Sequence, residues 1–194
     1  MVALASKYPS NFLQEETQMS TTETQVVPAG TWTVDKVHSN IGFAVGYLAG
    51  TFTGSFSDFD AEVRDGVLRG SAKVASVQVK DPNLEAHLQA PDFFDAERYP
   101  EITFESKDNR RDGDRLTIDG EITIKGHTEP VEISGVISDP INDPYGGERF
   151  GLKLEAKIDR TKFGVNWNNP LPSGEQALSN EVTLIADVQL SKQA

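Results

Sequence analysis

Strict alternation between apolar and polar side chains is the feature that most constrains how this sequence can fold. It is clearest in the segments 114–125, 149–159 and 180–191. The apolar positions on one face of these segments are Leu116, Ile118, Gly120, Ile122, Ile124, Phe150, Leu152, Leu154, Ala156, Ile158, Val182, Leu184, Ala186, Val188 and Leu190. Successive side chains of a strand point to opposite faces, so a period of two predicts antiparallel strands with one buried and one solvated face.

Turn-forming residues divide the chain from residue 31 onward into eight or nine such strands. The predicted strands cover residues 31–35, 38–48, 51–64, 67–79, 101–108, 114–125, 129–138, 149–159 and 180–191. Asp65-Gly66 and Asp112-Gly113 fit tight hairpin turns that need positive φ. Strands joined by short turns form a closed barrel or a sandwich, and long strands with one apolar face favour closure, because closure removes exposed edges. The predicted fold class is therefore all-β, a single antiparallel barrel of eight to nine strands.

One helical segment interrupts the strands. Asp81 is a suitable N-cap and Pro82 fits the first helical position, so we expect a short helix at 82–90. A further short turn carries the adjacent rings of Phe93 and Phe94, which must point in different directions. We expect this insertion to plug one end of the barrel, with one ring lining the interior and the other anchored against the wall.

The composition excludes several classes of function. The chain has 194 residues, no cysteine and a formal net charge of −12. Without cysteine, no disulfide framework, thiol nucleophile or thiolate metal site can form. The negative charge repels phosphate backbones and anionic headgroups, so we expect no nucleic-acid binding and no stable membrane insertion.

The first 28 residues differ in character from the rest. They are rich in polar residues, so we expect 1–28 to be a disordered N-terminal extension and 29–194 to form one barrel domain. The apolar run at 2–5 is too short for a secretory signal, and no stretch approaches the roughly 20 apolar residues that span a membrane. A cytoplasmic location is the resulting expectation.

Three histidines are the main candidates for chemistry. His38 opens a predicted strand and His127 lies in a predicted turn, and no two histidines have the spacing of a metal site. His87 shares the helix face that should point into the barrel, where it is either a hydrogen-bonded core residue or a ligand contact. No nucleophile elbow, phosphate-binding loop or dinucleotide fingerprint is present. We therefore predict no catalytic residues, no cofactor and no metal.

Several segments resemble the YceI-like family. They are TWTVDKVHSNIGFAV, GTFTGSFSDFDAEV, HLQAPDFFDAERYPEITFES, LTIDGEITIKGHTEPVEI and FGVNWNNPLPSGEQALSNEVTL, in the family's order, and the resemblance covers residues 30–192. It implies a lipocalin-like barrel with a helical insertion and a long apolar cavity for isoprenoid chains or other amphiphiles. One departure is that Gly46 and Tyr47 stand where family members commonly carry a basic residue or histidine.

With this resemblance, aromatic and aliphatic side chains from many segments become the candidates for a lipid cavity. The residues expected to line it are Phe43, Phe56, Leu84, His87, Leu88, Phe93, Phe94, Tyr99, Phe104, Ile122, Phe150, Leu154, Phe163 and Trp167. An ordinary filled core is the alternative, because an eight-stranded barrel is just wide enough to be filled or to hold one slender ligand.

The leading functional hypothesis is a soluble protein that carries or sequesters a polyisoprenoid or a similar long-chain amphiphile, in isoprenoid quinone metabolism, transport or stress response. One alternative is an enzyme that acts on a hydrophobic substrate, with His87 as the acid or base. Another is a stress-associated interaction module with a filled core. A homodimer is compatible with such a barrel, although no sequence feature locates an interface.

Overall fold

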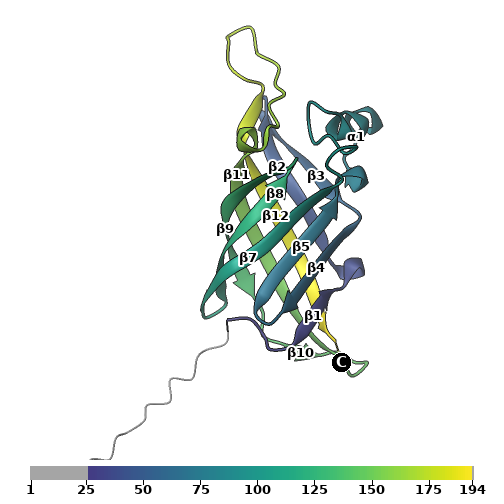
Figure 1. Ribbon diagram of the computed structural model, residues 1–194, viewed down its shortest axis with the longest axis vertical. Coiled ribbons are helices and arrows are strands. Elements are labelled where there is room, and N and C mark those ends of the chain that lie inside the picture. Colours follow the sequence, from purple (N-terminus) through teal and green to yellow (C-terminus); the bar gives the residue numbers. More distant parts are fainter. Residues whose placement is uncertain (1–25, 194) are drawn as a thin grey trace, which may run out of the picture.

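The computed structural model describes residues 26–193, which form a closed eight-stranded antiparallel β-barrel with one short α-helix (Figure 1). What was expected of residues 1–25 lies outside the described part of the chain. The strands are β1 (Thr31–Val34), β2 (Asn40–Tyr47), β3 (Gly50–Phe56), β4 (Phe59–Arg64), β5 (Val67–Lys73), β6 (Val77–Gln78), β7 (Glu101–Asp112), β8 (Arg115–Ile124), β9 (His127–Ile137), β10 (Ile141–Asn142), β11 (Glu148–Asp159) and β12 (Leu178–Lys192). The helices are α1 (Pro82–Gln89) and the 3-10 turns η1 (Lys36–His38), η2 (Val74–Ser76) and η3 (Arg160–Phe163).

The barrel is an up-and-down meander of eight walls, where a wall is one strand or two consecutive strand segments, and each wall pairs with the next wall along the chain. Three of its eight walls are broken strands, namely β1 with β2, β3 with β4, and β5 with β6. The ring continues through β7, β8, β9 and β11 to β12, which pairs on its other side with both β2 and β1. Small β10 pairs with β11 outside the ring.

The prediction of continuous strands at 51–64 and 67–79 is wrong, because each of these segments is interrupted in the structure. The first breaks at 57–58 and the second at η2, and the two breaks face each other. The Ser76 hydroxyl accepts a hydrogen bond from the Asp58 amide at 3.0 Å, and the Ser57 amide donates to the Ser76 carbonyl at 3.1 Å. At the breaks, contacts between residues about 18 positions apart replace the regular hydrogen bonds between strands. The local alternation of side chains cannot reveal such contacts.

The predicted turn at Asp65-Gly66 has the expected backbone, but at the predicted Asp112-Gly113 turn β7 continues through Asp112, the turn falls at 113–114, and only Gly113 has a positive φ, 62°. Asp65 and Gly66 between β4 and β5 both have positive φ, 52° and 80°. Lys125 and Gly126 between β8 and β9 have the same signs, 51° and 75°. Two successive positive φ values match the right-handed twist of the flanking strands, so these turns set the register of their hairpins.

The interior divides into two hydrophobic clusters stacked along the barrel axis. The closed-end core contains Val27, Trp32, Val63, Leu68, Leu116, Ile118, Ile137, Phe150, Leu152, Leu154, Val188 and Leu190. The mouth-end core contains Phe43, Val45, Phe56, Phe59, Ala72, Val77, Leu88, Phe93, Ile122, Ile124, Val131, Ala156, Phe163, Val165, Leu178 and Val182. Figure 1 shows α1 and the segment 164–177 at one end of the barrel, here called the mouth end, and β10 at the other.

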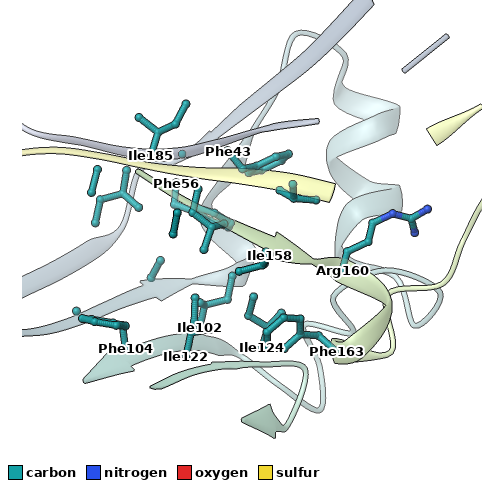
Figure 2. Close-up of a pocket in the computed structure, with 18 of the residues that line it drawn as sticks. Phe43, Phe56, Ile102, Phe104, Ile122, Ile124, Ile158, Arg160, Phe163 and Ile185 are labelled. Atoms are coloured by element: carbon teal, nitrogen blue, oxygen red, sulfur yellow. The ribbon is translucent and has the colours of Figure 1, made fainter. Parts of the chain in front are cut away.

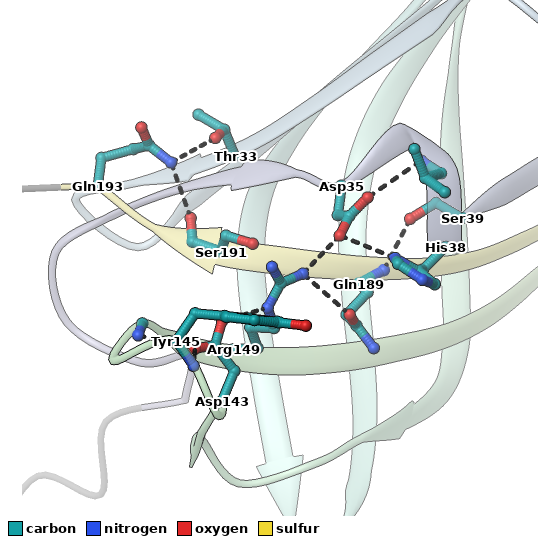
Figure 3. A network of polar contacts seen from close by, with 12 residues as sticks. Thr33, Asp35, His38, Ser39, Asp143, Tyr145, Arg149, Gln189, Ser191 and Gln193 are labelled. Atoms are coloured by element: carbon teal, nitrogen blue, oxygen red, sulfur yellow. Dashed lines mark hydrogen bonds and ion pairs between the residues drawn. The ribbon is translucent and has the colours of Figure 1, made fainter.

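The closed end is pinned by a polar network as well as by its core (Figure 3). The Asp35 carboxylate accepts hydrogen bonds from His38 Nδ1 at 2.9 Å, Arg149 Nη1 at 2.5 Å and the Val37 amide at 3.0 Å. Arg149 also donates to Asp143 at 2.8 Å. The hydrogen bond from His38, followed by that from Arg149, holds the pKa of the Asp35 carboxyl well below its usual range. The network thus ties the break between β1 and β2 to β11 and to the turn before it.

Candidate lipid-binding cavity

The mouth half of the barrel encloses an apolar cavity of about 360 Å³. Its wall is made by inward side chains of the barrel strands together with α1, η3 and the segment that follows η3. Figure 2 shows aliphatic and aromatic side chains, among them Phe43, Phe56, Ile102, Ile122 and Ile158, converging from different strands. Charged residues of the same strands, such as Arg69 and Glu155, occupy outward positions and are exposed. The alternation in the sequence therefore places the charges outside and leaves an almost purely apolar lumen.

Two glycines make room for aromatic rings in this wall. A Cβ at Gly54 on β3 would lie 2.6 Å from the Phe43 ring, and a Cβ at Gly120 on β8 would lie 2.6 Å from the Phe104 ring. Both distances are too short for real contacts, so each ring occupies space that only a glycine leaves free. The two glycines thus determine how these rings are positioned along the cavity wall.

The helical insertion covers part of the mouth, as expected. Asp81 Oδ1 accepts hydrogen bonds from the amides of Asn83 and Leu84 at 2.8 and 3.2 Å, which caps α1 at the predicted residue. The Glu85 carboxylate accepts from the Val79 amide at 3.0 Å and ties the helix to the end of β6. The helix ends at Gln89, one residue before the predicted end. Its apolar side chains Leu84 and Leu88 lie on the cavity wall.

Phe93 and Phe94 diverge, as their adjacency requires, and both border the cavity. Phe93 is buried, and its ring centroid lies 5.2 Å from that of Trp167 in the segment after η3. Phe94 is half-buried and points to the opposite wall, with ring centroids 6.5 Å from Phe43 and 6.3 Å from Phe56. The pair therefore connects the insertion to two different sides of the barrel.

His87 lies on the rim of the mouth. Its Nε2 is 2.6 Å from Asp92 Oδ2, and its ring meets Phe93 and Trp167 edge to face at 4.8 and 5.5 Å. The side chain is more than a third exposed, and it does not lie on the cavity wall. The contacts are those of a hydrogen-bonded rim residue that orients the aromatic pair beside it.

The structure brings most of the predicted site residues together around one cavity. Those on its wall are Phe43, Phe56, Leu84, Leu88, Phe93, Phe94, Phe104, Ile122, Leu154, Phe163 and Trp167. Three lie elsewhere. His87 is on the rim, Tyr99 packs against Gly126 in the β8–β9 turn, and Phe150 is in the closed-end core. Phe150 has the same alternation as Leu154, so periodicity could not separate the two.

Other wall residues were absent from the predicted set. Ile124, Ile158 and Val182 lie on it and belong to the inward faces that the alternation predicts. Arg160 in η3 also borders the cavity, and no sequence signal pointed to it.

Arg160 is a buried cation that holds the mouth-end segment to the barrel. Its Nη1 donates to the carbonyls of Val165 and Trp167 at 2.6 and 2.8 Å, and its Nε donates to the Ser179 carbonyl at 2.8 Å. Its Nη2 lies 3.3 Å from Asn180 Oδ1. In Figure 2 its guanidinium points away from the apolar side chains. Burial lowers the pKa of this arginine.

Other kinds of site have little support in the described part of the chain. Within residues 26–193, no group of three His, Cys, Asp or Glu side chains lies close enough together to hold a metal ion. No helix in that range is long and apolar enough to cross a membrane.

The fold and the cavity define the class of this protein, a closed antiparallel β-barrel built around one apolar cavity. The chain belongs to the YceI-like domain family, whose model matches residues 32–190. It is 29% identical over 171 residues to protein YceI of Escherichia coli O157:H7, covering 83% of this chain and 86% of that protein.

Solved structures share the fold. BcnA of Burkholderia cenocepacia has a TM-score of 0.69 and 22% identity, covering 80% of this chain and 98% of that one. A polyisoprenoid binding domain from Saccharophagus degradans has a TM-score of 0.60 and 9% identity, covering 84% of this chain and 98% of that one. At these identities the likeness establishes the barrel architecture alone.

Proposed function

We propose that this protein carries or sequesters one long-chain amphiphile, with the apolar chain inside the barrel and the polar headgroup at the mouth. The observation that carries the proposal is the cavity of about 360 Å³ with an almost entirely apolar wall. Such a wall offers no hydrogen bonds to a polar metabolite, whereas a hydrocarbon chain has no hydrogen bonds to lose on entering it.

The energetics favour chain binding over chemical discrimination. Each methylene removed from water contributes about 0.8 kcal/mol, so a chain that fills the cavity gains several kcal/mol from burial alone. Apolar contacts distinguish poorly between chains of similar shape. We infer that prenyl and acyl chains both enter, and that any finer selection depends on chain length and on the rim.

The polyisoprenoid binding domain of similar fold makes a polyisoprenoid the first ligand to test. Roles in isoprenoid quinone metabolism, transport or stress response are compatible with such a ligand. We infer a binding role rather than catalysis, because His87, the one acid–base candidate, lies on the rim hydrogen-bonded to Asp92.

Native mass spectrometry of the purified protein, followed by organic extraction and lipid analysis, tests the proposal. We expect a fraction of the protein to carry one lipid, which the extraction then releases. Ala156→Phe is the matched control, because Ala156 is buried on the cavity wall and a ring there fills the lumen. Lipid absent from the parent protein, even after exposure to a polyisoprenoid, would reject the proposal. An equal lipid load in the control would place the lipid outside the cavity.

A further inference from the structure

The cavity does not run the length of the barrel. Along β11 its wall includes the inward residues from Ile158 down to Leu152, but not Phe150, the next inward residue. Along β12 the wall reaches Val188, but not Leu190. The empty space therefore stops at the same level on two neighbouring strands.

The floor beneath it is made of three fully buried side chains, Trp32, Phe150 and Leu190, each no more than 1% exposed. The rings of Trp32 and Phe150 meet edge to face, with centroids 4.8 Å apart. Trp32 Nε1 lies 3.2 Å from the Pro28 carbonyl and 3.1 Å from that of Ala29.

This floor is also held from outside the barrel. Arg149, which precedes Phe150 on β11, is fixed by its hydrogen bonds to Asp35 and Asp143. Rings packed at close range and held by hydrogen bonds resist displacement by a weakly interacting chain end. The floor thus acts as a fixed stop.

We propose that this aromatic floor sets the length of hydrocarbon that the protein encloses, an inference that rests on the proposed function. The wall spans six residue steps of β11, from Leu152 to Ile158. At about 3.3 Å per step and a strand tilt of about 40°, the part of the cavity between these two residues is about 15 Å deep. An extended chain with every torsion staggered at 180° advances about 1.3 Å per carbon, so about 12 carbons fit.

The ligand class is therefore a single-chain amphiphile with about 12 enclosed main-chain carbons, such as a dodecyl or farnesyl chain. Longer chains bind with the surplus outside and gain no affinity from it.

Displacement of a fluorescent fatty-acid probe by straight-chain fatty acids of 8 to 18 carbons tests this inference, at concentrations below micelle formation. We expect the affinity to rise about fourfold per carbon up to about 12 carbons and then to level off. A steady rise to 18 carbons would overturn the floor inference while leaving the proposed function intact. Binding of no chain at all would overturn both.

Two variants move the stop in opposite directions. Phe150→Ala opens the next inward level, about 5 Å lower. The chain length at which the affinity stops rising, here called the break, should therefore increase by about four carbons. Ala186→Phe places a ring on the cavity wall one inward level above Val188, so the break should move to shorter chains. If Phe150→Ala does not fold, the break measured in Ala186→Phe alone decides whether the inference holds.

Val63→Ala is the control for lost packing, because Val63 is fully buried in the closed-end core and is not on the cavity wall. Its break should stay at the parent length. An unchanged break in Ala186→Phe, or an equal shift in Val63→Ala, would show that the floor does not set the chain length.

Discussion

Replacing Arg160 with methionine should loosen the mouth of the barrel. The guanidinium is buried and joins two parts of the chain, the segment after η3 through Val165 and Trp167 and the start of β12 through Ser179. Methionine fills similar space along the cavity wall but donates no hydrogen bond, so it isolates the effect of the donors from that of the aliphatic stem.

The expected cost follows from the acceptors that lose their donor. Val165 is buried, so its carbonyl is left without a partner, at about 1–3 kcal/mol. Water can reach the carbonyls of half-buried Trp167 and exposed Ser179, which reduces their contributions. Removing a desolvated cation recovers part of the loss. A net destabilisation of about 1–3 kcal/mol results, and in a domain of this size it lowers the melting temperature by about 2–12 °C.

Thermal unfolding followed by circular dichroism measures the change, and hydrogen exchange of the amides in 164–178 locates it. Lys162→Met is the matched control, since Lys162 is an exposed cation in the same turn. We expect faster exchange across 164–178 in Arg160→Met only, and an intermediate effect in Arg160→Lys, which keeps the charge without the planar donors. A melting temperature within about 2 °C of the parent, with unchanged exchange, would show that Arg160 does not hold the mouth-end segment to the barrel.

Three further perturbations test other parts of the structure. Phe93→Ala removes a buried ring and should cost about 3 kcal/mol or more, whereas Phe94→Ala should cost less and mainly speed ligand dissociation; the reverse order in melting and stopped-flow release would contradict this. Because the folded-state pKa of Asp35 is depressed, its stabilising contribution is present above pH ~4 and lost as the pH falls further, so the urea-unfolding difference between the parent and Asp35→Asn should shrink from pH 7 to pH 2. A constant difference would exclude that linkage. Chelator treatment should leave the melting temperature unchanged, and a shift of several degrees would reveal a metal site.

The fold was predictable wherever a local rule decides it. A period of two places Leu116, Ile118 and Ile122 on the buried face of β8 whatever the rest of the chain does, and the structure has them there. The breaks in the first three walls follow no local rule. They depend on partners distant in sequence, such as Ser76 for Asp58.

The site was predictable only as a set of inward side chains. Alternation gives Phe150 and Leu154 the same status, but Phe150 packs on Trp32, which is 118 positions away in the sequence, and so forms the floor. The end of the cavity is thus a long-range packing property. Arg160 was invisible for a different reason, because a buried arginine bonded to backbone carbonyls leaves no pattern in the sequence.

The two tryptophans of the chain allow a direct test of a bound chain in the mouth half of the barrel. Trp167 borders the cavity near its mouth, whereas Trp32 is part of its floor, at the far end of the cavity from the mouth. A fatty acid brominated next to its carboxylate quenches tryptophan at contact range. Titration should quench the parent protein and saturate at one chain per protein, while Trp167→Phe, which keeps only Trp32, should bind the chain with little quenching. Absence of saturable quenching in the parent, or equal quenching in both proteins, would contradict the account.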